Sequence, residues 1–313
     1  MSEPKVLFEE HGEVAVIKLN RPEKRNALDP ETVLLFNDYT EKAKDKKFKS
    51  VVITGNGNAF CAGADLTPSG DGMGWESVEK ALNEGYHIGL NNLISMDKVV
   101  IAAVEGPCAG IGCAYYMSSD IVIMARSSFF QIGFSKIGLI PDGGSTWLLP
   151  RIVGYQKALR MATEAQRVIA EECKELGLCS EISEDGQSLN NALEMATAYA
   201  DYAPIALMRT KNLMRESFSR SYYDQLKQEA KLQDEKKRSL SHITMATVHF
   251  IGCGKFGLAT FFYLLNTALS FAPPILLTLF LEGLEGTHPR TQLELGLISL
   301  GMLVLPMLTN IIR

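Results

Sequence analysis

Residues 51–66, VVITGNGNAFCAGADL, decide the fold of this chain. Val51–Thr54 is an unbroken β-branched run, which is typical of a strand buried on both faces. Turn residues Gly55–Asn58 follow, and then the small side chains of Phe60–Leu66. Small residues after a strand let a ligand approach the backbone, and Gly63 can adopt a positive φ. The stretch predicts a buried strand that ends in a ligand-binding turn.

A second strand and turn of the same kind lie further along the chain. Val99–Val104 is another buried run, and the small residues of Pro107–Ala114 lead into a predicted helix over Gly110–Ser118. The first turn of a helix presents free N–H donors. A single turn of small residues more often serves only to let neighbouring segments pack closely than to bind a ligand. Together they could form a two-donor hole for a developing oxyanion.

The rest of residues 1–245 alternates strand and helix patterns, which predicts an α/β layered fold with repeated strand–strand–helix units. The expected strands are Val6–Glu10, Val14–Leu19 and Ile121–Ala125, and the expected helices are Pro30 to about Asp45 and Val78–Met96. From Tyr155 to about His242 only helical patterns are visible. The core should therefore be followed by a C-terminal helical segment.

Composition excludes several classes of function. The formal net charge of −5 over 313 residues argues against nucleic acid as a partner. The six cysteines form no CxxC pair, so no metal site is expected, and Cys61, Cys108 and Cys113 should behave as small buried hydrophobes. Neither turn matches GxGxxG, so no nicotinamide cofactor is expected.

Residues 246–313 form a predicted hydrophobic tail. Residues 256–281 and 295–312 carry no charge, and each run is long enough to cross a bilayer as a helix. Basic residues before the first run place the preceding module on the cytoplasmic side of a membrane. The alternative is a helical hairpin buried in a soluble domain.

Gly138–Trp147 contains one candidate catalytic group, Asp142, between an apolar run and a Gly-Gly turn. A carboxylate beside apolar residues can act as a general base with a raised pKa. Asp is also a common N-cap, so the pattern alone fits equally well with Asp142 capping the next helix.

These motifs resemble the crotonase, or enoyl-CoA hydratase/isomerase, superfamily. Residues 19–28 (LNRPEKRNAL), 60–66 and 101–112 match its motifs in order and spacing, over about residues 5–240. The resemblance implies a ββα spiral core, a homotrimer or hexamer, no cofactor beyond the coenzyme A of an acyl-CoA substrate, and oxyanion donors at Ala64 and Ile111. The residues implied to bind substrate or coenzyme A are Lys24, Arg25, Ala62, Gly63, Asp65, Leu66, Gly110, Phe134 and Trp147.

The chain departs from this family at two positions. Hydratases of the family use two glutamates to add water, and Ala114 and Phe134 occupy the matching positions here. Hydration is therefore not expected. A lone acid at Asp142 resembles the Δ3,Δ2-enoyl-CoA isomerases, and Ile121–Gly154 resembles the isomerase of phenylacetate degradation. The expected reaction is conversion of a 3-enoyl-CoA to a 2-enoyl-CoA.

In that reaction Asp142 would remove a proton α to the thioester and return it at C4. Ile140, Phe134 and Trp147 are expected to raise its pKa by desolvation. The alternatives are isomerisation of 1,2-epoxyphenylacetyl-CoA to oxepin-CoA and a catalytically silent acyl-CoA-binding module. The expected location is the cytoplasmic face of a membrane, and the family implies a mitochondrion or peroxisome as the alternative.

Overall fold

The computed structural model describes residues 3–66 and 75–235. The chain divides into two compact units, Met1–Gln225 and Leu226–Arg313. All named elements lie in the first unit, and residues 226–235 of the second are helical. No described helix is both long and apolar enough to span a bilayer. The predicted membrane helices, 256–281 and 295–312, and the predicted boundary near residue 245 lie outside the described residues.

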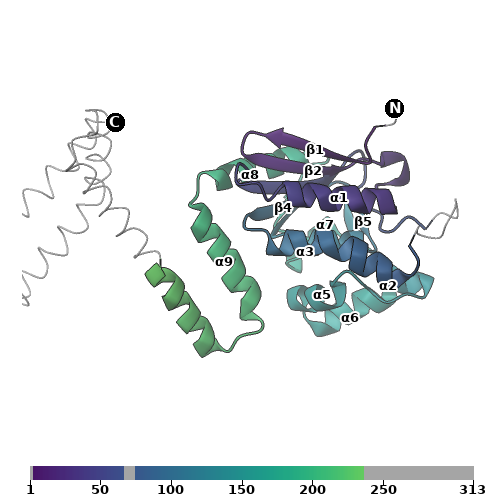
Figure 1. Ribbon diagram of the computed structural model, residues 1–313. Coiled ribbons are helices and arrows are strands. Elements are labelled where there is room, and N and C mark those ends of the chain that lie inside the picture. Colours follow the sequence, from purple (N-terminus) through teal and green to yellow (C-terminus); the bar gives the residue numbers. More distant parts are fainter. Residues whose placement is uncertain (1–2, 67–74, 236–313) are drawn as a thin grey trace, which may run out of the picture. The chain divides into compact units, whose positions relative to one another are not determined.

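A six-stranded mixed sheet forms the centre of the first unit, in the order β1-β2-β3-β4-β6-β9 (Figure 1). Its strands are β1 (Val6–His11), β2 (Val14–Leu19), β3 (Ser50–Gly55), β4 (Val99–Val104), β6 (Ile121–Ala125) and β9 (Glu181–Ser183). β1 pairs antiparallel with β2, and every other neighbouring pair is parallel. The strands predicted around residues 51–54 and 99–104 are thus at the middle of the sheet.

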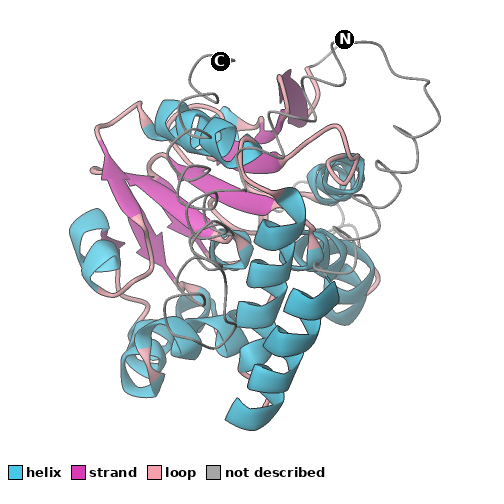
Figure 2. Cartoon of the chain, turned by 90° about the vertical axis from the view of Figure 1, so that its left-hand side faces the viewer, coloured by secondary structure: helices cyan, strands magenta, loops and turns pink. Residues whose placement is uncertain are grey.

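Helices cover both faces of this sheet (Figures 1 and 2). On one face, Ile17 and Ile53 pack in a core with α1 (Pro30–Lys42), α3 (His87–Ser95) and α4 (Gly112–Ser118). On the other, Val16 and Val52 pack with α8 (Ser188–Ala200). Since successive strand residues point to opposite faces, burial on both faces requires the continuous apolar runs seen in the sequence.

A three-stranded sheet, β5 (Pro107–Ala109), β7 (Phe129–Gln131) and β8 (Val168–Ile169), begins where the second turn starts. The backbones of Cys61 and Cys108 pair in an isolated parallel β-bridge, which connects the first turn to this sheet. Both thiols are free. The remaining helices are η1 (Pro22–Lys24), α2 (Val78–Lys80), η3 (Ala81–Tyr86, π-helical), η4 (Phe134–Ile137), α5 (Ser145–Val153), α6 (Tyr155–Glu164), α7 (Ala170–Glu175) and α9 (Pro204–Ser217).

The expected α/β core and C-terminal helices are confirmed, with local differences. The helix predicted over residues 110–118 starts at Gly112, and the one predicted over 78–96 contains the π-helical stretch η3. The purely helical prediction beyond Tyr155 is wrong, because β8 and β9 lie there. These strands have two and three residues, too few to show an alternating pattern.

Candidate active site

The first turn is held by backbone hydrogen bonds to Leu28. Leu28 N donates to Gly63 O at 2.8 Å, and Asp65 N donates to Leu28 O at 3.0 Å. Ala64 lies between these two bonds, opposite Leu28 in a parallel bridge. Its own N–H has no hydrogen-bond partner within the described residues. The bridge therefore fixes the direction of a free backbone donor.

The second turn lies directly against the first. Gly63 has a φ of +100°, and a Cβ placed on it would lie 3.1 Å from Ala109 O and 3.6 Å from Ile111 N. Gly110 also has a positive φ, +55°. Ile111 precedes α4, and its N–H likewise has no partner in the described part of the chain. The two predicted donors are thus unpaired N–H groups on turns that contact each other.

The loop of Asp142 lies beside the second turn. The next residue, Gly143, has a φ of +59°, and a Cβ on it would lie 2.7 Å from Ala114 Cβ and 3.2 Å from Ile111 Cγ1. The loop that carries the carboxyl therefore packs against the residue that carries the second donor. The alternative role of Asp142 as a helix cap is not observed, because Gly144 is the N-cap of α5 and has no capping side chain.

The carboxyl of Asp142 is poorly solvated. Its Oδ1 is shielded from solvent and has no hydrogen-bond partner among the described residues. Burial raises the pKa of Asp142 from 3.8 to about 6. Desolvation disfavours the charged form of a carboxyl, and it outweighs the opposing effect of a backbone hydrogen bond. A carboxyl with such a pKa can accept a proton and return it near neutral pH.

Two tyrosines lie near Asp142. Burial raises the pKa of Tyr86 and of Tyr115, and the charge of Asp142 adds to both shifts. The Tyr86 hydroxyl donates to Leu28 O at 3.3 Å, whereas the buried Tyr115 hydroxyl has no partner in the described residues. No feature of the sequence distinguishes these tyrosines from ordinary core residues, and they were not predicted as part of the site.

The residues expected to bind coenzyme A have different environments. Lys24 and Arg25 are exposed, and Arg25 O accepts a hydrogen bond of 3.0 Å from Ala62 N. Two cations therefore lie at the edge of the first turn. Asp65 is instead paired with Arg21 at 2.8 Å in a mostly buried ion pair, and Leu66 is exposed. The geometry gives Asp65 a structural role in bracing the turn.

Of the three predicted apolar neighbours of Asp142, Ile140 and Trp147 are placed differently from expectation. Ile140 is 81% exposed, so it cannot supply the predicted desolvation. Trp147 lies in a separate cavity with Phe218 and Arg151, although the prediction assigned it to the substrate. Phe134 is buried in the core cluster that also holds Leu90, Ala114 and Ile111. Leu90 and Ala114 lie around Gly143, the residue after Asp142, and the sequence did not reveal these apolar neighbours of the loop.

Sequence reasoning also missed the residues that shape the loop before Leu28. Asn26 is buried with a φ of 56°, and its Nδ2 donates to Asn56 O at 3.0 Å and to Ala59 O at 2.6 Å. Its Oδ1 accepts from Arg21 N at 2.8 Å. The motif of residues 19–28 predicts that this loop binds coenzyme A, but it does not reveal that a polar side chain within it holds the loop in place.

Two unpaired backbone N–H groups on adjoining turns and a desolvated carboxyl form a candidate site whose chemistry suits stabilising an enolate oxygen and moving a proton. The family model described as enoyl-CoA hydratase/isomerase matches residues 9–256. The chain belongs to this family, the crotonase superfamily, whose activity is hydration or isomerisation of acyl-CoA thioesters.

Named relatives carry both activities. A probable enoyl-CoA hydratase of Rhodobacter capsulatus is 35% identical over 240 residues, which cover 76% of this chain and 92% of the relative. The 1,2-epoxyphenylacetyl-CoA isomerase of Escherichia coli is 32% identical over 235 residues, covering 73% and 88%. The crystal structure of an enoyl-CoA hydratase from Polaromonas sp. JS666 matches with a TM-score of 0.68 and 32% identity, covering 79% and 96%.

Proposed function

We propose that this protein isomerises an unsaturated acyl-CoA, converting a 3-enoyl-CoA to a 2-enoyl-CoA with Asp142 as the only proton-transfer group. The observation that supports this proposal most strongly is the desolvated Asp142 carboxyl beside the turn of Ile111, whose Oδ1 has no hydrogen-bond partner among the described residues. The resemblance to the hydratases also supports isomerisation over hydration. Those enzymes have glutamates at the positions that match Ala114 and Phe134, and neither of these two side chains can activate water.

The proposed chemistry needs one base and two donors. Asp142 takes a proton from C2, and the electron pair passes into the thioester carbonyl to give a dienolate. The N–H groups of Ala64 and Ile111 stabilise the dienolate oxygen, a contribution of about 3–4 kcal/mol per donor in comparable sites. The protonated Asp142 then delivers the same proton to C4, so the carboxylate is regenerated and no cofactor is consumed.

Paired assays of the full-length protein test this proposal. Isomerisation of a 3-enoyl-CoA should be measurable, hydration of a 2-enoyl-CoA should not, and Asp142→Asn should abolish isomerisation while keeping affinity for the acyl-CoA. Asp38→Asn, on the exposed side of α1, is the matched control. Near-normal turnover by Asp142→Asn, or efficient hydration, would refute the assignment.

The similarity to 1,2-epoxyphenylacetyl-CoA isomerase favours a second candidate, isomerisation of that substrate to oxepin-CoA. Parallel assays of both substrates separate the two reactions. A protein that binds acyl-CoA but converts neither substrate would instead be the silent binding module.

We also propose a homotrimer or hexamer anchored by residues 246–313 to the cytoplasmic face of a membrane. The support for the anchor is the uncharged sequence of residues 256–281 and 295–312. Separation of expressed protein into membrane and soluble pools, with the isomerase assay on each, tests the location. Recovery of the activity in a mitochondrial or peroxisomal fraction would favour the alternative locations instead.

A further inference from the structure

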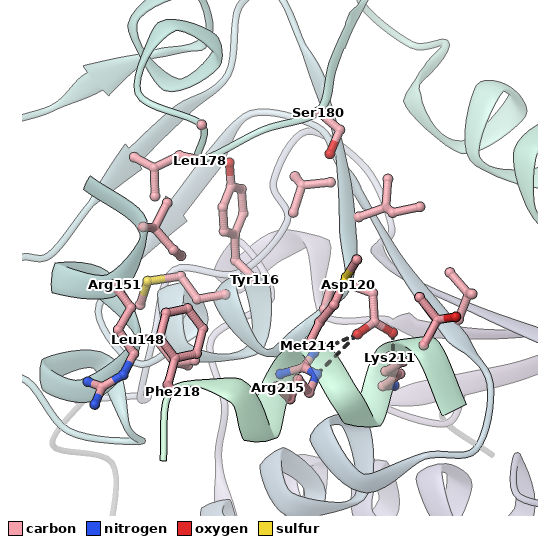
Figure 3. Close-up of a pocket in the computed structure, with 18 of the residues that line it drawn as sticks. Tyr116, Asp120, Leu148, Arg151, Leu178, Ser180, Lys211, Met214, Arg215 and Phe218 are labelled. Atoms are coloured by element: carbon pink, nitrogen blue, oxygen red, sulfur yellow. Dashed lines mark hydrogen bonds and ion pairs between the residues drawn. The ribbon is translucent and has the colours of Figure 1, made fainter. Parts of the chain in front are cut away.

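A cavity with a volume of about 450 Å³ lies between the core and α9 (Figure 3). Its walls come from α4, β6, α5 and α9, and most of its lining is apolar, with Leu148, Leu178 and Met214 among the side chains. Neither Asp142 nor the two turns of the candidate active site line it. Its volume lies within the range of small-molecule pockets.

One wall of this cavity carries a compensated charge network. Asp120 pairs with Lys211 at 2.8 Å and with Arg215 at 2.7 Å, and these interactions are drawn in Figure 3. The same carboxyl accepts from Val100 N at 2.9 Å. Asp120 is therefore saturated by its own neighbours and cannot neutralise a third cation.

That third cation is Arg151, on α5. Its guanidinium carbon lies 3.9 Å from the centre of the Trp147 ring and 5.7 Å from that of Phe218, and Nη1 donates to Trp147 O at 2.9 Å. No carboxylate of the described residues pairs with it. The two rings hold the guanidinium in place and leave N–H groups free, so Arg151 can bind a carboxylate in a forked geometry.

We propose that this cavity binds an amphipathic monocarboxylate, with its carboxylate on Arg151 and its aliphatic chain among the apolar side chains. The charges that line the cavity favour an anion. Three cationic side chains line it, those of Arg151, Lys211 and Arg215, and among its described lining residues Asp120 is the only carboxylate that pairs with any of them. The apolar lining favours an alkyl chain over a small hydrophilic anion. This site is independent of the proposed isomerase reaction.

Calorimetric titration of the full-length protein with decanoate, below the concentration at which it forms micelles, tests the site. Saturating coenzyme A is included so that the acyl-CoA cleft is blocked. Decanoate should bind, 1-decanol should bind more weakly, and Arg151→Gln should weaken decanoate binding by about ten- to a hundredfold. Arg160→Gln is the matched control, because Arg160 is exposed on α6 and pairs with Glu164.

Tryptophan fluorescence locates the bound chain. The change in emission caused by decanoate should disappear in Trp147→Phe, which keeps an aromatic ring under Arg151. Equal decanoate affinity of native protein and Arg151→Gln, or displacement of decanoate by coenzyme A, would overturn the proposal. A stable assembly of copies that buries Trp147 and takes up no decanoate would show that a second chain occupies this face, and would also overturn it.

Discussion

Substitution of Asp142 by asparagine should remove activity and at the same time stabilise the protein. The folded-state pKa of this carboxyl is raised from 3.8 to about 6, so at neutral pH the fold holds a charge that it solvates poorly. A difference of about two pKa units corresponds to about 3 kcal/mol if the group were fully shielded. Because the residue is only partly buried, solvent screening reduces the expected gain to about 1 kcal/mol.

The sign of this effect fixes its pH dependence. Protonation is favoured in the folded state, so the destabilisation by Asp142 is fully present above pH 6 and disappears as the pH falls below 4. The free energy of unfolding of Asp142→Asn should therefore exceed that of the native protein at pH 7–8, and the difference should vanish near pH 4. Urea unfolding curves of both proteins at several pH values measure this difference in the free energy of unfolding.

Kinetics give an independent measure of the same pKa. A base must be ionised to accept the C2 proton, so kcat/KM for isomerisation should fall as the pH drops through about 6. Asp38→Asn should leave both the profile and the stability unchanged. A kcat/KM that is flat between pH 5 and 7, together with equal stabilities of the native protein and Asp142→Asn at pH 8, would refute the argument.

Three further substitutions probe the supporting structure, each measured as the free energy of urea unfolding. Gly143→Ala should cost about 1–3 kcal/mol and reduce turnover, because its Cβ would lie 2.7 Å from Ala114 Cβ at a φ of +59°. Asn26→Ala should cost about 3 kcal/mol, since its buried side chain makes three hydrogen bonds. Asp120→Ala should cost about 3–5 kcal/mol by leaving buried Lys211 uncompensated. Changes below about 0.5 kcal/mol would contradict these assignments.

The sequence predicted the central strands and the two turns because their physical requirements are local. A strand buried on both faces must be continuously apolar, and Val51–Thr54 and Val99–Val104 meet that condition. The close contact of Gly63 with Ala109 and Ile111 likewise depends on small residues that are visible in the sequence. The contact between the two turns could therefore be anticipated from the sequence.

The surroundings of Asp142 were not accessible in the same way. Leu90 and Ala114 from distant parts of the chain surround Gly143, the residue after Asp142, whereas its sequence neighbour Ile140 is 81% exposed. Burial of a loop residue depends on elements distant in the chain, so adjacency in sequence was a poor guide. The short strands β8 and β9 were missed for a related reason, because only their partners in the sheets define them.

The bridge to Leu28 has a consequence for how the chain can vary at position 64. The bonds that orient this residue belong to Gly63 O and Asp65 N, so its side chain takes no part in aiming the amide. A substitution that preserves the packing of this partly buried residue against the core should therefore leave the donor in place. Proline is the exception, because it has no N–H, and its appearance at this position in a homologue would mark a lineage that has abandoned oxyanion chemistry.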